Sequence, residues 1–589
     1  MNCPSRPDDT ECHPGWNQSP QSLNSDATTR ADLNGIVNQR VKHGHEDSTT
    51  SDNHQNDISG LSAPELKRAI SKEEKCGVVN TATRESPVCD SYNGQASPPV
   101  SGNESGARRG QSNEPWYRQT ASRVTDVLVK YARFVGPGFL VAVAYIDPGN
   151  YATDVGAGAS TQYAHLFVIL MSNLFAIFLQ SLCIKLGSVT GLDLAENCRK
   201  HLPRWMVYVL YVLSEGAIIA TDVAEVVGTA IALNLLLKVP LVAGCAISLV
   251  DVFLLLLFYN PDGSLTRLRI FEYFVMFLVL GVMICFCIQL SYIRDTSIGD
   301  VFRGYIPSSA VIEGNGVYLS CGILGATVMP HSIFLGSGVV QPRLRQFDEQ
   351  NMSIIVQAET YRRSQNLEDK YRPTIGAIRS CLKYSIVELA TSLFTFALFV
   401  NSAILIVAGS SLYNNPEAPD ADLFSIHDLL VRTISPAAGV LFALALLLSG
   451  TSAGIVCTMA GQMVSEGMLR WKLRPWLRRL MTRSISIIPS IIIAAAVGKE
   501  GLNQTLTASQ VALSVALPFV TAPLLWFTCK SSIMTVSSDE NGRRFDGEGA
   551  STKVNMRNGW IVAILGALIW LVLVIMNVAL IVLAAMGKA

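Results

Sequence analysis

A long apolar segment of the chain is interrupted by the sequence Ala144-Tyr145-Ile146-Asp147-Pro148-Gly149-Asn150-Tyr151. Proline removes a backbone N–H and clashes with the preceding turn, so this sequence breaks the helix expected over residues 133–157. A second apolar segment, residues 312–339, is broken in the same way by Gly325-Ala326-Thr327-Val328-Met329-Pro330-His331-Ser332. Broken backbone at membrane depth is tolerated only where protein encloses it or where it lines a cavity. The two stretches therefore predict a membrane protein with a cavity near the bilayer centre.

Apolar segments of membrane-spanning length recur along the rest of the chain. A bilayer core about 30 Å thick needs about 20 apolar residues in a helix. By this criterion the sequence predicts eleven spans, at 133–157, 162–187, 205–233, 240–259, 270–293, 312–339, 379–409, 433–464, 482–499, 507–529 and 559–586. Charged residues make up only 16% of the chain, against about 25% in soluble domains. This composition excludes a single soluble enzyme and indicates an all-α membrane protein.

The positions of the two breaks suggest how the spans are organised. The broken spans are the first and the sixth, which begin corresponding halves of a five-plus-five arrangement. Two interrupted spans in corresponding positions are typical of an inverted-repeat secondary transporter. The repeat is inferred from the number of spans, because the halves show no clear similarity residue by residue.

The distribution of basic residues predicts the orientation. Lys and Arg concentrate in the loops that follow even-numbered spans, for example at Arg199, Arg343 and Arg479, and are scarce in the opposite loops. Because cytoplasmic loops carry the excess of positive residues, we expect the N-terminus in the cytoplasm and the C-terminus outside the cell or in a lumen. The membrane itself would be the plasma membrane or an endosomal or vacuolar membrane.

Residues 1–115 differ in composition from the rest of the chain. They are rich in Ser, Asn, Asp, Gly and Pro and contain no Phe. Such a segment cannot bury enough apolar surface to offset its chain entropy. We expect a disordered cytoplasmic tail over 1–115, followed by a transmembrane transporter domain over 116–589. Its Ser and Lys residues are candidate sites for phosphate and ubiquitin, which would make kinases or ubiquitin machinery its partners.

Composition also excludes several other classes of function. The formal net charge is zero, which gives no case for nucleic acid as a partner. No phosphate-binding loop of the GxxxxGK[ST] type and no hydrolase motif is present, so we expect neither ATP hydrolysis nor another enzymatic activity. Most of the 13 cysteines lie in apolar runs and the others match no zinc spacing. We expect no structural disulfide.

The residues at the two breaks offer a set of metal ligands. Asp147 places a carboxylate at membrane depth, where it costs roughly 2.5–3.5 kcal/mol and normally faces a pathway or a partner. Asn150 adds an amide oxygen, Met329 a thioether, and Pro330 cannot donate a hydrogen bond to the carbonyl of Ala326. Each feature has a structural explanation when taken alone, since Met commonly fills cores. Together they suit a divalent cation of intermediate softness, whereas Mg²⁺ and Ca²⁺ prefer oxygen alone.

The third span carries three acidic residues, Glu215, Asp222 and Glu225. Positions i, i+7 and i+10 fall within about 80° of one another on an α-helix. Acids on one face of a membrane helix line water, carry protons or hold basic partners. One interpretation is a proton route that leads from the metal site. The alternative is a buried ion-pair network with Arg478, Arg479 or Arg483.

These motifs resemble those of the Nramp divalent-metal transporters. The likeness rests on Asp147-Pro148-Gly149-Asn150, on Met329-Pro330-His331, on the acidic helix at 214–229, and on the sequences at 450–454, 460–467 and 509–519. It covers residues 120–529 in order, and the long tail with the loop 341–378 resembles the fungal Smf-type manganese transporters. Two positions depart from the family pattern: Ser332, where Asn commonly follows the His, and Thr451, where many members have Gln.

The resemblance implies a LeuT-like fold and symport of protons with Mn²⁺, Fe²⁺ or similar ions, without a cofactor. By motif match, the metal ligands would be Asp147, Asn150, Met329 and the Ala326 carbonyl, and Gln510 would approach them in some states. The proton route would contain Asp147, His331, Glu215, Asp222 and Glu225. Two other functions fit the same architecture: a sodium-coupled transporter of organic solutes, and a transport-inactive metal receptor that signals through its tail.

Overall fold

The computed structural model describes residues 136–250, 265–293, 296–313, 315–351, 371–413, 422–470, 475–496, 498–538 and 552–586. The predicted tail, residues 1–115, lies outside this part of the chain. The first elements are α3 (Pro137–Val143), α4 (Pro148–Thr161), α5 (Leu166–Thr190), α6 (Leu194–His201), α7 (Arg204–Leu237), α8 (Leu241–Ile247), α10 (Leu265–Tyr292), α11 (Ile298–Arg303), η1 (Ser309–Val311), α12 (Gly316–Thr327), α13 (Pro330–Gly338) and α14 (Gln341–Asn351). They are followed by α16 (Ile375–Ser392), η2 (Leu393–Ala397), α17 (Leu398–Ser411), α18 (Leu423–Thr433), α19 (Pro436–Leu469), α20 (Pro475–Ala496), α21 (Lys499–Cys529), β1 (Thr535–Ser538), β2 (Thr552–Asn555) and α22 (Trp560–Ala585).

Within the described residues, eight helical segments are long and apolar enough to cross a membrane. They correspond to predicted spans two, three, five, six, seven, eight, ten and eleven. The first predicted span is divided between α3 and α4, and α8 is the described helix within the fourth. The ninth contains a shorter apolar helix, Arg483–Ala496. The membrane-spanning helical architecture is therefore present, whereas the count of eleven stays a prediction.

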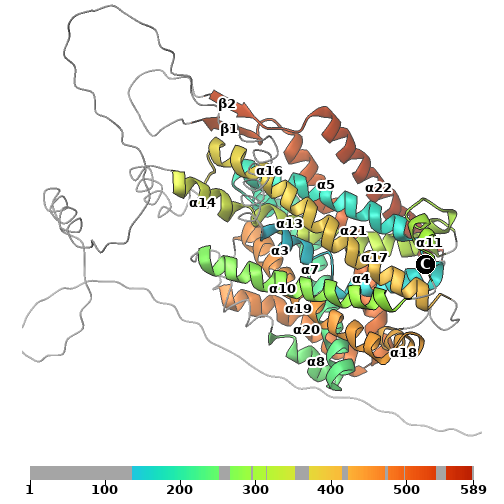
Figure 1. Ribbon diagram of the computed structural model, residues 1–589. Helices are drawn as coiled ribbons and strands as arrows, with labels where there is room; N and C mark the ends of the chain where they lie inside the picture. The colour runs from blue at the N-terminus through green and yellow to red at the C-terminus, as the bar shows by residue number, and fades with distance from the viewer. Residues whose placement is uncertain are drawn as a thin grey trace, which may run out of the picture. The chain divides into compact units, whose positions relative to one another are not determined.

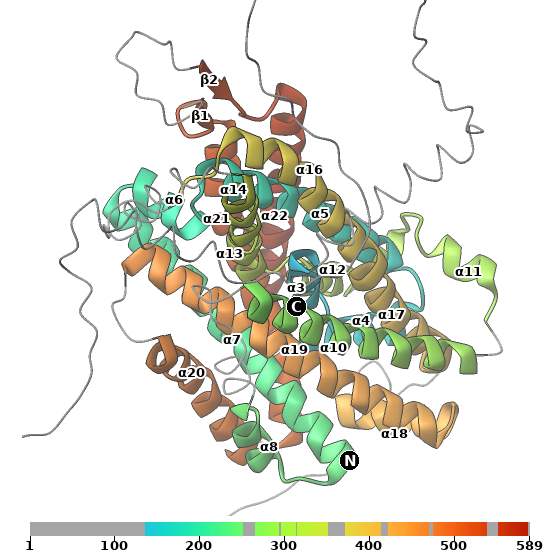
Figure 2. The ribbon, with the colours of Figure 1, turned by 60° about the vertical axis from the view of Figure 1, so that its left-hand side comes forward.

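The helices pack into a bundle around α7 and α19, which cross in extensive contact with each other (Figures 1 and 2). The most apolar window of α7 is 83% buried inside the protein, whereas that of α22 is 22% buried. Helix α22 is thus peripheral, and its apolar side chains are available to lipid. One element differs from the expected all-helical chain. Strands β1 and β2 form an antiparallel ribbon between α21 and α22, in which Val536 is opposite Val554.

Both predicted breaks are present, and in each an extended residue directly precedes the proline that begins the next helix. Helix α4 begins after the N-cap Asp147, and α13 begins after the N-cap Met329. Both caps are extended, with ψ of 168° and 131°, because the residue before a proline is biased away from the helical region. Each proline also stands four residues after an alanine, so the carbonyls of Ala144 and Ala326 lack their usual helical donor. All four half-helices, α3, α4, α12 and α13, are central in the bundle (Figure 2).

Candidate functional site

Asp147 is held at the first break with one carboxylate oxygen uncommitted. Its side chain is fully buried, and Oδ1 accepts a hydrogen bond from the backbone N–H of Asn150 at 2.9 Å. The other oxygen, Oδ2, has no hydrogen-bond partner among the described residues. An N-cap carboxylate is favoured by the exposed N–H groups and the positive end of the helix dipole. The break therefore explains why a charged side chain is tolerated here.

Asn150 and Gln510 add further uncommitted oxygens. The Asn150 amide donates to the carbonyl oxygen of Tyr145 at 3.0 Å, and its Oδ1 accepts no hydrogen bond from the described residues. Gln510 is fully buried on α21, and its Oε1 is likewise without a donor in that part of the chain. Buried polar atoms are rarely left unpaired in folded proteins. Three unpaired oxygens around one break therefore indicate a site for a cation or for water.

Gln510 lies against both breaks because each has a glycine at the contact. A Cβ atom on Gly149 would lie 1.8 Å from Gln510 Nε2, and one on Gly325 would lie 2.5 Å from the Gln510 carbonyl oxygen. Helix α21 consequently touches the first turn of α4 and the end of α12 at the same residue. This contact brings Gln510 to the predicted site.

Met329 and Ala326 occupy the equivalent place at the second break. Both are fully buried, and Met329 directly precedes α13 as Asp147 precedes α4. The structure thus places the two prolines, the two caps and Gln510 in one central region. Joint coordination of a metal ion by the Met329 sulfur and Asp147 stays a prediction.

A hydrogen-bonded cluster that sequence reasoning missed ties the two broken spans together. Gln180 on α5 donates to the Tyr145 hydroxyl at 2.9 Å and to the Ser332 carbonyl at 2.9 Å. The hydroxyls of Tyr145 and Ser332 are also hydrogen-bonded, at 2.9 Å. Ser332, one of the two departures from the family pattern, therefore connects the residues around both breaks. The other departure, Thr451, bonds the Leu447 carbonyl of its own helix at 2.9 Å.

The three acids of α7 share one side of the helix, as their spacing predicts. Glu215 and Asp222 line a cavity between α7 and α19, together with Cys457 and Thr458. Asp222 and Glu225 both pair with the fully buried Arg483 of α20, Glu225 at 3.4 Å. The predicted ion-pair alternative is thus present for Arg483. The side chains of Arg478 and Arg479 lie outside the described part of the structure.

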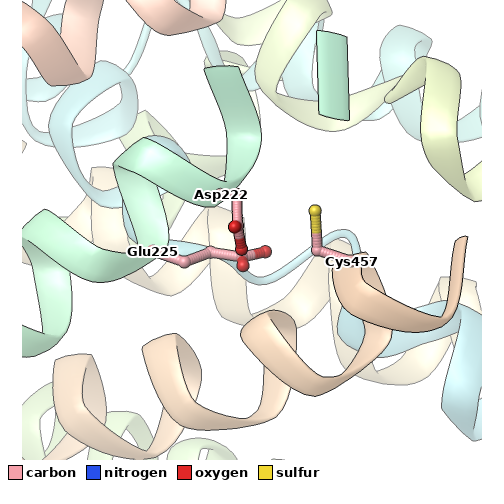
Figure 3. Close-up of side chains that lie close together, drawn as sticks. All are labelled: Asp222, Glu225 and Cys457. Atoms are coloured by element: carbon pink, nitrogen blue, oxygen red, sulfur yellow. The ribbon is translucent and has the colours of Figure 1, made fainter. Parts of the chain in front are cut away.

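Asp222, Glu225 and Cys457 also form a group with ligand atoms close enough to surround a metal ion. Figure 3 shows the carboxylates of Asp222 and Glu225 close together, with the side chain of Cys457 beside them. The Arg483 guanidinium already pairs with both carboxylates, however, and Ser486 donates to Asp222. A second cation would have to displace a buried arginine, which is strongly unfavourable. We therefore interpret this group as an ion-pair network.

His331 connects the second break to the acidic helix. It is buried on α13, and its Nδ1 lies 3.4 Å from the Thr221 hydroxyl of α7. Thr221 directly precedes Asp222, so this contact joins α13, which carries His331, to α7, which carries the three acids. Among the described side chains, the Oε2 atom of Glu215 has no hydrogen-bond partner.

Glu388 on α16 holds the beginning of α3. Its Oε1 accepts hydrogen bonds from the backbone N–H groups of Gly136 at 2.7 Å and Gly138 at 3.0 Å. These are N–H groups that a helix end leaves without intrahelical acceptors. Next to this contact, Arg343 and Glu272 form a buried salt bridge at 3.1 Å. Four segments distant in sequence therefore meet at the beginning of α3.

Replacing Glu388 with alanine is expected to lower the free energy of unfolding by about 3 kcal/mol, because two buried N–H groups lose a charged acceptor. Thermal unfolding of the purified protein measures the change. The control is Glu349→Ala, which removes a carboxylate from a half-exposed pair with Arg345. A Glu388→Ala shift no larger than that of the control would contradict this role.

With the geometry of the breaks established, comparison with known proteins identifies the chain. A family model for Nramp, natural resistance-associated macrophage protein-like, matches residues 138–544. The chain belongs to the Nramp family. This match includes both breaks, the acidic helix and Gln510, and it confirms the resemblance predicted from the motifs.

Individual Nramp relatives are similar over most of their length. The manganese transporter SMF1 of Saccharomyces cerevisiae is 53% identical over 503 residues, which cover 79% of this chain and 88% of the relative. The iron transporter SMF3 of the same organism is 51% identical over 419 residues, or 71% and 85% of the two chains. A crystal structure of the Eremococcus coleocola manganese transporter, in complex with an aromatic bis-isothiourea substituted compound, has a TM-score of 0.61 and 32% identity. It covers 75% of this chain and 85% of that one.

Proposed function

We propose that this chain is a proton-coupled symporter that imports divalent transition-metal ions such as Mn²⁺ and Fe²⁺ by alternating access. The unpaired Oδ2 of Asp147, buried at a helix break beside Asn150 and Gln510, is the observation that carries the proposal. Relatives over 50% identical are named as manganese and iron transporters, which supports the same class of substrate.

The proposal includes the arrangement of the membrane domain. Residues 116–589 form eleven spans in a LeuT-like inverted repeat, with the first and sixth spans interrupted. The extended cap before a proline at each of the two breaks supports the repeat. The tail is cytoplasmic and the C-terminus is outside or in a lumen, as the loop charges predict.

Metal and proton compete for Asp147 in this mechanism. A bound ion takes the Oδ2 oxygen together with the Asn150 and Gln510 amide oxygens, the Ala326 carbonyl and the Met329 sulfur. A proton on the same carboxylate removes the charge that attracts the metal. His331 and the α7 acids provide the proton route, and the 3.4 Å contact between His331 and Thr221 supports a connection between α13 and α7. Arg483 compensates the charges of Asp222 and Glu225 along that route.

Reconstitution in proteoliposomes tests the function. We expect uptake of radiolabelled Mn²⁺ that accelerates when the outer solution is acidic and that is accompanied by proton influx. Uptake that requires Na⁺ and an organic solute would instead support the sodium-coupled alternative. Complementing a cell deficient in metal uptake with residues 116–589 alone distinguishes transport from signalling, because a receptor would need its tail.

Met329 is expected to set selectivity against hard cations. Replacing it with alanine removes the soft thioether, so the remaining oxygen ligands should favour Ca²⁺ and Mg²⁺ more than the original site does. We expect inhibition of Mn²⁺ uptake by Ca²⁺ to increase about tenfold, measured as the inhibitory concentration in proteoliposomes. Met576→Ala on peripheral α22 is the matched control. Unchanged competition by Ca²⁺ and Mg²⁺ would refute the thioether argument.

A further inference from the structure

Asp154 is a buried carboxylate that the proposed metal site and the acidic helix do not use. Its side chain has no exposed surface, and neither Oδ1 nor Oδ2 has a hydrogen-bond partner among the described residues. Asp147, whose charge has the same sign, further disfavours a negative charge on Asp154. A buried carboxylate is strongly unfavourable unless something neutralises it. Asp154 therefore needs a ligand.

The helical spacing places Asp154 at the contact between α4 and α17. Asn150, Asp154 and Gly158 are four residues apart, so they lie on one face of α4. At one end of this face, the side chains of Asn150 and Asn401 both donate to the Tyr145 carbonyl at 3.0 Å. At the other end, a Cβ on Gly158 would lie 2.6 Å from the Leu405 carbonyl oxygen, so the two backbones touch. Asp154 lies between these contacts, where α4 and α17 run side by side (Figure 2).

Asn401 contributes a third unpaired oxygen to the same interface. It is fully buried on α17, its Nδ2 is committed to Tyr145, and its Oδ1 has no donor in the described structure. Asn401 and Leu405 are four residues apart and thus share the face of α17 that contacts α4. Asp154 and Asn401 together offer three oxygen ligands and no sulfur ligand, with one negative charge in total.

This donor set fits a hard cation of single charge. Oxygen ligands suit alkali and alkaline-earth ions better than soft transition metals. A proton on Asp154 would supply a single hydrogen-bond donor. A cation, in contrast, accepts several oxygen ligands at once. A monovalent ion also leaves the buried interface neutral.

We propose that Asp154 and Asn401 bind a monovalent alkali cation, with sodium as the probe, between α4 and α17. The close contact of Gly158 with Leu405 blocks the passage of an ion at the end of the interface away from the break, so the ion is not transported. The bound ion instead stabilises the pairing of the two helices. The proposal does not depend on metal transport by the neighbouring site.

Thermal unfolding of the purified full-length chain tests the proposal. The melting temperature is measured in chloride salts of sodium, potassium and N-methyl-D-glucamine at equal ionic strength. We expect a saturable rise of about 3 °C with an alkali cation over N-methyl-D-glucamine. Equal melting temperatures in all three salts would overturn the proposal, and this result does not depend on any variant.

Two variants assign the effect to the interface. Asp154→Asn keeps the shape but removes the charge, and it should abolish the cation-dependent rise, whereas Asp300→Asn on the exposed face of α11 should keep it. A cation response in Asp154→Asn equal to that of the original chain would overturn the assignment. Calorimetric Mn²⁺ binding by Asp154→Asn should stay within about threefold of the original. Loss of Mn²⁺ binding in the original chain would count against the proposed function and leave the cation site unaffected.

Discussion

Mn²⁺ uptake by the Asp147→Ala variant is expected to fall by about 100-fold. The change removes the charged ligand of the proposed site, and an ionic contact of this kind is worth about 1.5–3 kcal/mol, or roughly 10- to 150-fold in affinity. It also removes the acceptor for the Asn150 N–H, which would loosen the beginning of α4. Initial rates of radiolabelled Mn²⁺ uptake in proteoliposomes measure the loss.

Asp300→Ala provides the control for this experiment, because it deletes an exposed carboxylate on α11, which lies at the edge of the bundle (Figure 2). Asp147→Asn separates charge from shape, since an amide can still accept the Asn150 hydrogen bond. We expect Asp147→Asn to remain folded and to lose uptake as Asp147→Ala does. Intact uptake in both Asp147 variants would show that the carboxylate is not a ligand.

The second large effect is expected at Arg483. Replacing it with methionine keeps a long side chain but leaves the carboxylates of Asp222 and Glu225 without their buried cation. Removing one partner of a buried ion pair typically costs about 3–5 kcal/mol of stability. The thermal unfolding temperature of purified Arg483→Met should therefore fall strongly.

A second substitution tests the cause of this instability. Adding Asp222→Asn to Arg483→Met removes one of the uncompensated charges and should recover part of the lost stability. Arg345→Ala breaks an exposed pair with Glu349, so its unfolding temperature should hardly change. If Arg483→Met melted like Arg345→Ala, the buried network would be energetically unimportant.

The sequence predicted the features that depend on local chemistry. The two breaks follow from Pro148 and Pro330 within apolar runs, and the common face of Glu215, Asp222 and Glu225 follows from helical spacing. The sequence identified Arg483 only as one of three candidate arginines that could pair with the acids. The choice among them depends on how α20 packs against α7. The ribbon β1–β2 was missed because its short polar strands carry no clear pattern of alternation.

The missed site residues share a different cause. Gln180, Glu388 and Asp154 are single polar residues within largely apolar helices, and their positions in the sequence give no partner. The roles of Gln180 and Glu388 depend on contacts across 152 and 252 residues, with Ser332 and Gly136 respectively. A polar residue at membrane depth was the available signal, and Asp147 shows that this signal is informative.

The extended cap at the first break has a thermodynamic consequence. Asp147 is at once a proposed ligand and the residue whose backbone dihedrals set the angle between α3 and α4. An ion that draws the carboxylate into one position also restrains the hinge of its own binding site. If a movement at this hinge weakens ion binding by a given free energy, thermodynamic linkage requires that the bound ion disfavours that movement by the same free energy. Ion binding and the angle between α3 and α4 are thus coupled through a single residue.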